Sequence, residues 1–350
     1  MARPQNPEIE RFILEHVEAR PGDIGPFTAG RFGVTRATAT NYLNRLVGAG
    51  VLTARGSTRA RTYALRPMTH IRGMVRIEPR MEDDAVFLRE ILPALGGLPR
   101  DLVAICQYGF TSAVRNVFDH SGADSFGWWL HRDVRRVELG VSDNGRGALE
   151  SIRSTFRFED DRRSALELVK GGLTADPSRR AGLGLFVAAR LFDRFTLASG
   201  VLRLVRDQEH DRRGRVAVTP LTAPMAGTAV TMVLAADADR SLGDVLSRYG
   251  ADGGLRSRAD APVALVGGAG ETLVSRSQAR RLLHRLEAVS ELALDFEGVE
   301  VIGPDFAHEI FAVFRTEHPG VAIEARAMNE AVARVVAAAT AFGDGLKPCD

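Results

Sequence analysis

Cysteines and long apolar runs are both scarce in this sequence. Only two of its 350 residues are cysteines, Cys106 in a helical run and Cys349 near the end, and their spacing matches neither a metal site nor a disulfide framework. No apolar run approaches the ~20 residues of a membrane-spanning helix, and the opening MARPQNPEIE lacks the apolar core of a signal peptide. We therefore expect a cytoplasmic protein with no membrane partner.

The net charge is also small, at a formal value of +2. A hydrophobic content of 45% and a charged content of 26% are those of ordinary globular domains. At 350 residues the chain is long for one domain, so we expect two or three. The charge is uneven, because residues 1–70 hold ten arginines against five acidic residues, a local charge of +5.

Residues 1–70 show the pattern of three helices followed by a hairpin. The segment GPFTAGRFG predicts a short second helix and a turn, and TRATATNYLNRLVGAG predicts a third helix with Thr35 as its N-cap. The next residues, VLTARGSTRARTYALRP, alternate, turn at Gly56-Ser57 and alternate again. Apolar residues repeat at helical spacing in the first and third helices: Ile9, Phe12, Ile13, Val17, Ala39, Leu43 and Leu46.

This arrangement resembles the winged helix-turn-helix domains of bacterial transcription regulators. The resemblance implies DNA binding, which the local positive charge favours, although some such domains contact proteins instead. The third helix would meet a groove while arginines of the wing reach phosphates. The residues expected to contact DNA are Arg36, Thr38, Thr40 and Arg45 on the helix, and Arg55, Arg59 and Arg61 on the wing.

Three short motifs further along the chain predict one common site. YGFTSAVRNVFDHS (108–121) predicts an amphipathic helix whose polar side carries Asn116. VSDNGRG (141–147) follows an alternating strand and places Asp143 before a sharp glycine turn. AGLGL (181–185) is a glycine pair that opens a helical run, where backbone N–H groups and the helix dipole would face an anion.

In order and spacing these motifs resemble the GHKL ATPase superfamily of gyrase, Hsp90, histidine kinases and MutL, over roughly residues 80–236. The resemblance implies that Asn116 holds Mg²⁺ against the nucleotide phosphates and that Asp143 accepts a hydrogen bond from the adenine amino group. Thr228, which follows Gly227, would support the adenine end. The other cofactor-binding residues implied are Gly145 and Gly147 of the second motif, and Gly182, Leu183 and Gly184 of the third.

The chemistry of MgATP asks for the same residue types. A magnesium triphosphate needs a hard oxygen ligand, such as an asparagine amide, with dipoles or cations around its phosphates. Adenine needs a buried acceptor, and glycines let the backbone approach the ring. Residues 151–180, polar and rich in arginine, resemble the ATP lid of that family, with Gly171-Gly172 as a hinge and Lys170 as a cofactor contact. Taken singly, the DNG turn and the GLGL helix start are ordinary structural features.

One position departs from the family pattern. Members that hydrolyse ATP or transfer its γ-phosphate carry a glutamate general base four residues before the asparagine, whereas this chain has Ser112. A serine hydroxyl accepts no proton at neutral pH without a base of its own. Asp119 and His120 are weak substitute candidates about two helical turns from Ser112, and the alternative is a surface carboxylate and a partly buried histidine. The sequence therefore supports nucleotide binding better than catalysis.

Beyond a polar, glycine-rich boundary at 237–262, strands alternate with helices, which predicts a small α/β domain with a largely parallel sheet. The predicted strands are PVALVGG, ELALDFEGV and VAIEAR. The stretch LDFEGVEVIGPDFAHEIF resembles the STAS-like domains that accompany GHKL modules in bacteria. Such domains carry a phospho-accepting serine before this helix, whereas here Asp305 falls near that position. It either imitates the charge or is an ordinary aspartate at a helix start.

The expected fold is multidomain α/β: a winged helix-turn-helix domain (1–70), a GHKL α/β sandwich (75–237) and a small STAS-like α/β domain (258–345). The leading hypothesis is a bacterial transcriptional or signalling regulator that binds ATP and Mg²⁺ through the second domain and DNA through the first. The third would contact a protein partner, and a homodimer is compatible with this scheme. The alternatives are a serine/threonine protein kinase like the anti-sigma kinases, a GHKL ATPase, and a pseudo-ATPase scaffold.

Overall fold

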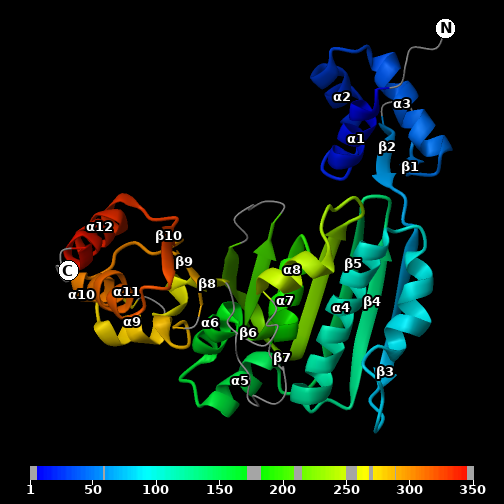
Figure 1. Ribbon diagram of the computed structural model, residues 1–350. Coiled ribbons are helices and arrows are strands. Elements are labelled where there is room, and N and C mark those ends of the chain that lie inside the picture. Colours follow the sequence, from blue (N-terminus) through cyan, green and yellow to red (C-terminus); the bar gives the residue numbers. More distant parts are fainter. Residues whose placement is uncertain are drawn as a thin grey trace. The chain divides into compact units, whose positions relative to one another are not determined.

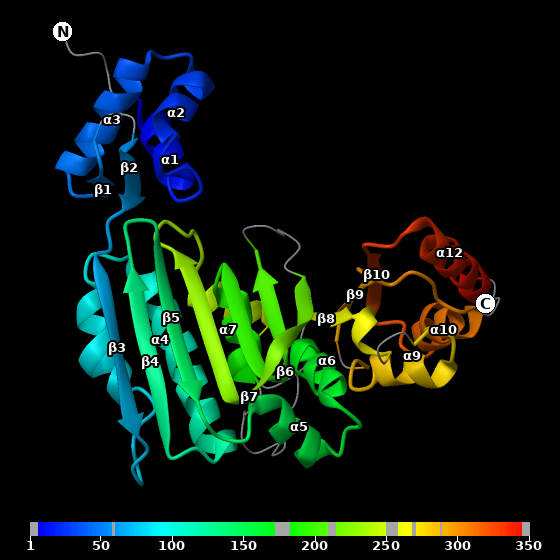
Figure 2. The ribbon, with the colours of Figure 1, turned by 180° about the vertical axis from the view of Figure 1, so that it is seen from behind.

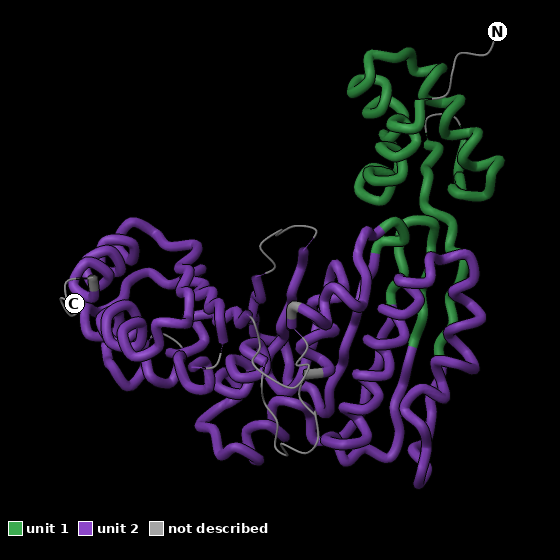
Figure 3. The backbone as a smooth tube through the Cα atoms, in the orientation of Figure 1, with its two compact units in different colours: residues 1–72, 129–138, 235–237 green, residues 73–128, 139–234, 238–350 purple. Residues whose placement is uncertain are grey.

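The computed structural model describes residues 6–57, 60–171, 183–208, 215–249, 258–267, 271–287 and 289–344 (Figure 1). The chain divides into two compact units, coloured separately in Figure 3. Unit 1 comprises Met1–Arg72, Trp129–Glu138 and Ala235–Asp237, and unit 2 comprises Gly73–Trp128, Leu139–Leu234 and Ala238–Asp350. In the described part of the chain, no helix has both the length and the apolar character that crossing a bilayer requires.

Unit 1 begins with three helices and an antiparallel hairpin, in the order that the sequence predicts. The elements are α1 (Pro7–His16), α2 (Ile24–Phe32), α3 (Arg36–Gly48), β1 (Leu52–Arg55) and β2 (Thr62–Leu65). Thr35 caps α3 as predicted, because its side chain accepts a hydrogen bond from the backbone N–H of Thr38. Gly33 ends α2 at a φ of +63°, a conformation that suits glycine. One core contains Ile9, Ile13, Val17, Ile24, Leu43, Leu46, Leu52, Tyr63 and Leu65.

Unit 1 also contains the turn between strands β4 (Ser125–Arg132) and β5 (Arg136–Asp143). Arg135 in this turn donates from Nη1 to the carbonyl oxygen of Leu14 at 3.2 Å, and Arg136 pairs with Glu18 at 2.9 Å. The second pair is nearly half exposed, so it contributes at most about 1 kcal/mol. The turn is thus tied to the end of α1 mainly through a backbone carbonyl.

A five-stranded sheet has the strand order β3-β4-β5-β7-β6. Its strands are β3 (Thr69–Arg76), β4 (Ser125–Arg132), β5 (Arg136–Asp143), β6 (Arg194–Asp207) and β7 (Val216–Ala235). Helices α4 (Arg100–Asn116) and α7 (Leu183–Leu191) lie on one face, and Figure 2 shows the opposite face. Helix α4 packs closely on the end of α7 because residue 109 is glycine: a Cβ on Gly109 would lie 2.3 Å from the ring of Phe192, the residue after α7.

Strand β7 contains two prolines, which ordinarily interrupt a strand. The sequence predicts a break at Pro220 and Pro224, but β7 continues through both prolines. Its register against β6 shifts between Ser199 and Gly200 and again before Leu202. An irregular ladder leaves positions at which no N–H is needed, and proline, which has none, is tolerated there.

The predicted boundary at 237–262 also differs, because it contains helix α8 (Leu242–Tyr249). Its apolar residues recur at helical spacing, and the Tyr249 ring centroid lies 6.1 Å from that of Phe186 on α7. This apolar pattern is short and lies among polar and glycine residues, so the sequence alone does not predict the helix. Two further helices, α5 (Ala148–Phe156) and α6 (Asp161–Lys170), occupy part of the arginine-rich stretch 151–180, whereas Gly172 lies outside the described residues.

The C-terminal part of unit 2 has a three-stranded parallel sheet, as predicted, with the order β10-β9-β8. Its elements are β8 (Arg258–Pro262), α9 (Arg276–Leu283), β9 (Glu291–Asp295), α10 (Pro304–His308), which continues through a π-helical segment (Glu309–Phe314) into α11 (Arg315–Glu317), β10 (Ala322–Arg326) and α12 (Glu330–Asp344). The first strand lies earlier than predicted, because Val263–Leu265 forms a 3₁₀ turn. A short apolar run does not distinguish a buried strand from a buried helical turn.

Candidate functional site

One wall of the candidate site is the end of α4 and the π-helical turn that follows it, Val117–Ser121. The apolar side of this segment is at most 2% exposed: Phe110, Ala113, Val114 and Val117. Asn116 and His120 are half exposed, and Asp119 is exposed. Among the described residues these three side chains have no hydrogen-bonding or ionic partner, so they are available to a ligand.

Asp143, the last residue of β5, is the central buried polar group. Its side chain is 8% exposed, and Oδ1 accepts a hydrogen bond from the backbone N–H of Gly145 at 2.9 Å. Its other oxygen, Oδ2, is buried without a hydrogen-bond partner among the described residues. Burial raises the pKa of Asp143, while the backbone N–H groups of Gly145 and Thr228 oppose that shift. A buried acceptor with no donor is unusual and indicates a missing partner.

The glycine turn after Asp143 lies directly on the end of the α4 segment. The backbone N–H of Arg146 donates to the carbonyl oxygen of Ser121 at 2.9 Å. A Cβ on Gly145 would lie 2.2 Å from the same oxygen, so only glycine fits. The first and second motifs therefore meet through Ser121, a residue that sequence reasoning did not assign to the site.

A second contact joins the glycine turn to β6 and β7. Gly147 has a φ of +87°, and a Cβ there would lie 2.7 Å from the hydroxyl of Ser199. Gly227 has a φ of +73°, and its Cβ would lie 2.0 Å from the carbonyl oxygen of Asp143. Thr228 is 3% exposed, and its hydroxyl accepts the N–H of Ala148 at 2.8 Å. Residues more than 80 positions apart thus converge around Asp143.

Ser199 completes this contact and was also not predicted. Its hydroxyl donates to the carbonyl oxygen of Gly227 at 3.2 Å, and it accepts the N–H of Leu149 at 3.4 Å. The side chain is fully buried. A lone serine inside an alternating strand gives no sequence signal of this role.

The third motif is described only in part. Gly182 lies outside the described residues, and Leu183 begins α7. A Cβ on Gly184 would lie 3.2 Å from both Cβ and Oγ of Ser112, so the start of α7 packs against α4 at the position where the sequence departs from the family pattern. The three motifs therefore come together as the sequence predicts, within the residues that are described.

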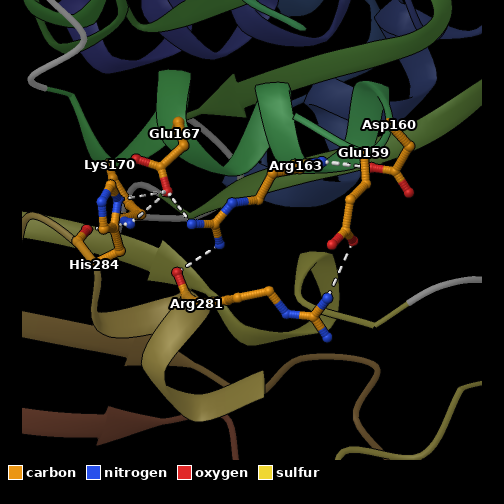
Figure 4. A network of polar contacts seen from close by, with 7 residues as sticks. All are labelled: Glu159, Asp160, Arg163, Glu167, Lys170, Arg281 and His284. Atoms are coloured by element: carbon orange, nitrogen blue, oxygen red, sulfur yellow. Dashed lines mark hydrogen bonds and ion pairs between the residues drawn. The ribbon is translucent and has the colours of Figure 1, made fainter. Parts of the chain in front are cut away.

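Lys170 is the last residue of α6. Its side chain is 1% exposed, and Nζ donates to Glu167 Oε1 at 2.8 Å and to the carbonyl oxygen of His284 at 2.7 Å. Its ammonium group is thus bound to α6 and to the residue that follows α9 (Figure 4). In the described residues no three His, Cys, Asp or Glu side chains form a metal site.

The residues predicted to contact DNA have different environments in unit 1. Arg36 and Thr40 are exposed on α3, but the Thr40 hydroxyl donates to the carbonyl of Arg36 at 2.8 Å. Thr38 is half buried, with its hydroxyl 2.9 Å from that of Thr35. The sequence predicts that Arg45 is free to contact DNA. In the structure Arg45 pairs with Glu10 instead.

On the hairpin, Arg55 is exposed at the end of β1, and the guanidinium of Arg61 lies 5.2 Å from the ring centroid of Tyr63. Arg59 lies outside the described residues. Gly56 has a φ of +77°, which suits the predicted turn between the two strands. Arg36 and Arg55 are therefore the most accessible of the described arginines in this set.

The C-terminal part of the chain matches a known class of domain. Residues 278–333 match the family model described as "STAS-like domain of unknown function (DUF4325)". The matched segment contains β9, β10 and the helices between them, so the STAS-like prediction is confirmed. Asp305 lies in the first turn of α10, exposed and 3.7 Å from Arg276.

No curated protein matches the chain. Among solved structures, an IclR transcriptional regulator from Alicyclobacillus acidocaldarius has 14% sequence identity, with coverage of 70% of this chain and 93% of that chain and a TM-score of 0.23. HmgR from Pseudomonas aeruginosa has 17% identity, with coverage of 71% and 98% and a TM-score of 0.17. At these scores the structural similarity to transcriptional regulators is weak.

Proposed function

We propose that this protein is a bacterial regulator that binds MgATP at the site around Asp143 and DNA through its N-terminal domain. The observation that carries the nucleotide part is the buried, unpartnered Oδ2 of Asp143. An unsatisfied buried polar group costs about 1–3 kcal/mol, so a ligand that supplies its donor gains affinity. The adenine amino group is such a donor.

The surrounding residues fit the rest of the nucleotide. Gly145, Gly147 and Gly227 carry no Cβ, so the backbone segments around Asp143 pack directly against one another and form the floor on which the adenine end would lie. Thr228 lies beside Asp143 with its hydroxyl oriented by Ala148, which leaves its hydrogen free to donate. Asn116 would hold Mg²⁺, a hard cation that favours amide and phosphate oxygens. Bound Mg²⁺ would neutralise part of the triphosphate charge.

The proposal is for nucleotide binding and not for rapid hydrolysis. Position 112 is a serine packed against Gly184, and Asp119 and His120 lie on the next turns of the helix. A general base must reach the proton that it removes. In this arrangement the nucleotide acts as a ligand that shifts the equilibrium between two conformations.

The DNA part rests on the N-terminal helices and hairpin, which follow one another in the order that the resemblance to winged helices implies. Arg36 and Thr40 on α3 and Arg55 on the hairpin are exposed, and residues 1–70 carry a formal charge of +5. Positive charge of this kind contributes the salt-dependent part of DNA binding. Arg45 is better assigned to the pair with Glu10 than to a groove contact.

Equilibrium titration of the full chain with labelled ATP and Mg²⁺ tests the nucleotide proposal. ATP should bind more tightly than GTP, because guanine carries a carbonyl oxygen where adenine carries its amino group, and that oxygen would face a second acceptor in Asp143. Asn116→Ala should weaken binding in Mg²⁺ but not in excess chelator. Absence of ATP binding, or equal binding of GTP, would contradict the proposal and favour a scaffold.

A further inference from the structure

Helix α6 carries a buried charged row that the nucleotide site does not use. Arg163, Glu167 and Lys170 lie on one side of the helix (Figure 4). Both cations contact the same oxygen, Glu167 Oε1, at 3.0 Å from Arg163 Nη2 and 2.8 Å from Lys170 Nζ. The side chains of Glu167 and Lys170 are only 3% and 1% exposed. A buried row of this kind is stable only when each charge has its partners.

The partners of the two cations on the opposite side are backbone carbonyl groups at the end of α9. Lys170 Nζ donates to the carbonyl oxygen of His284 at 2.7 Å, and Arg163 Nη1 donates to that of Arg281. Because α9 ends at Leu283, these carbonyls belong to a helix end whose oxygens lack intrahelical donors. That end also carries the negative pole of the helix dipole. Two cations of α6 therefore cap α9.

Further bridges surround this cap. Arg281 Nη1 lies 3.1 Å from Glu159 Oε2, and Arg162 Nη2 donates to the carbonyl of Ala264 at 3.0 Å. All these contacts join the stretch 151–180 to the chain around the STAS-like segment. The cap is specific rather than a chance surface contact, because its central charges are nearly fully buried.

We propose that the end of α9 and the nucleotide phosphates compete for Lys170, so that the STAS-like domain restrains nucleotide binding. The inference rests on the proposed function and takes Lys170, in the stretch that resembles the ATP lid, as a contact of the nucleotide phosphates, as the resemblance implies. The ammonium group of Lys170 is enclosed between Glu167 and the carbonyl oxygen of His284. It must therefore break its hydrogen bond to His284, at the end of α9, before it contacts a phosphate. Binding free energies are reciprocal, so bound nucleotide loosens the cap on α9 to the same extent that the cap weakens nucleotide affinity.

Two substitutions at the cap separate competition from a purely structural role. Glu167→Gln removes the carboxylate that holds Lys170, so the dissociation constant for ATP should fall at least about fivefold, the lower end of typical couplings. Lys170→Met should raise it by at least the same factor, because the phosphates lose a cation. If the dissociation constant for ATP changes in opposite directions in the two variants, competition is supported. If Lys170 serves only the cap, the dissociation constant should change in the same direction in both variants or not at all. Glu150→Gln is the matched control, since Glu150 pairs with Arg153 on α5.

Hydrogen exchange of the wild-type chain tests the same idea without a substitution. Saturating MgATP should increase amide exchange at 281–287, where the cap is lost, and unchanged or decreased exchange there would overturn the inference. This measurement decides the matter if Glu167→Gln fails to fold. The two proposals also fail differently. A wild type that does not bind ATP defeats the proposed function, whereas ATP binding with no response at Glu167, Lys170 or 281–287 defeats only the competition.

Discussion

Replacing Asp143 by asparagine changes one oxygen of the side chain and little of its shape. In the wild type Oδ1 is committed to the N–H of Gly145, so the amide oxygen of Asp143→Asn should keep that bond. The amide NH₂ group then occupies the position of Oδ2, which is the buried oxygen with no partner. Two donors, this group and the adenine amino group, would face each other.

The mismatch between these two donors sets the expected loss of ATP affinity. A buried polar group left without its partner costs about 1–3 kcal/mol, which corresponds to an increase of about 5- to 150-fold in the dissociation constant for ATP. Isothermal titration with MgATP measures it directly. Asp101→Asn is the matched control, because Asp101 is exposed in the first turn of α4, at the end of the helix away from Asn116, and has no side-chain partner among the described residues. An unchanged affinity for Asp143→Asn would refute the assignment of Asp143 to adenine.

The stability of the same variant distinguishes lost binding from lost structure. Burial raises the pKa of Asp143 above its ordinary value of 3.8, so the folded state holds this proton more tightly than the unfolded state. The free energy of unfolding therefore decreases as the pH rises from 3.8 through the raised pKa, and the loss is complete above it. Asp143→Asn removes this dependence. At neutral pH the variant should unfold at the same urea concentration as the wild type or a higher one, while binding ATP more weakly.

Other substitutions test the remaining contacts. Gly227→Ala should destabilise unit 2 by more than about 1 kcal/mol in chemical denaturation, because φ is +73° and its Cβ meets a carbonyl, whereas Gly243→Ala in α8 should be neutral or stabilising. Ser112→Glu should raise ATP hydrolysis, since general bases contribute about 10²–10⁴-fold, and brisk hydrolysis by the wild type would contradict the reasoning. Arg36→Ala should lower the salt dependence of DNA binding by about one unit, while Arg45→Ala, which loses the Glu10 pair, should leave that slope unchanged.

Local sequence determined most helices and strands of this protein. Thr35 caps α3 because a threonine oxygen reaches the N–H of Thr38 within one turn, a contact that needs no distant residue. The alternation of strands and helices after residue 258 likewise predicted a parallel sheet, because a helix between two strands returns the chain to the end of the sheet at which the first strand began. The three glycine-containing motifs could be recognised for the same reason, because their residue types and order are properties of the chain.

Local pattern failed where packing overrides propensity. Proline predicts the end of a strand, yet β7 passes through Pro220 and Pro224 because its ladder with β6 is irregular there. Helix α8 has too short an apolar pattern to stand out from its polar surroundings, and it gains its stability from contact with α7.

Only the tertiary structure decided the partners of the polar groups. Sequence marks Asp143 as a carboxylate before glycines, but the fold buries it and leaves Oδ2 without a donor. Sequence likewise marks Lys170 as a cation for a phosphate, whereas the fold places it against the carbonyl of His284, 114 positions away. Every residue has a backbone carbonyl, so nothing in the sequence identifies which one a buried lysine meets. That choice depends on how α6 and α9 pack, and packing is a property of the whole fold.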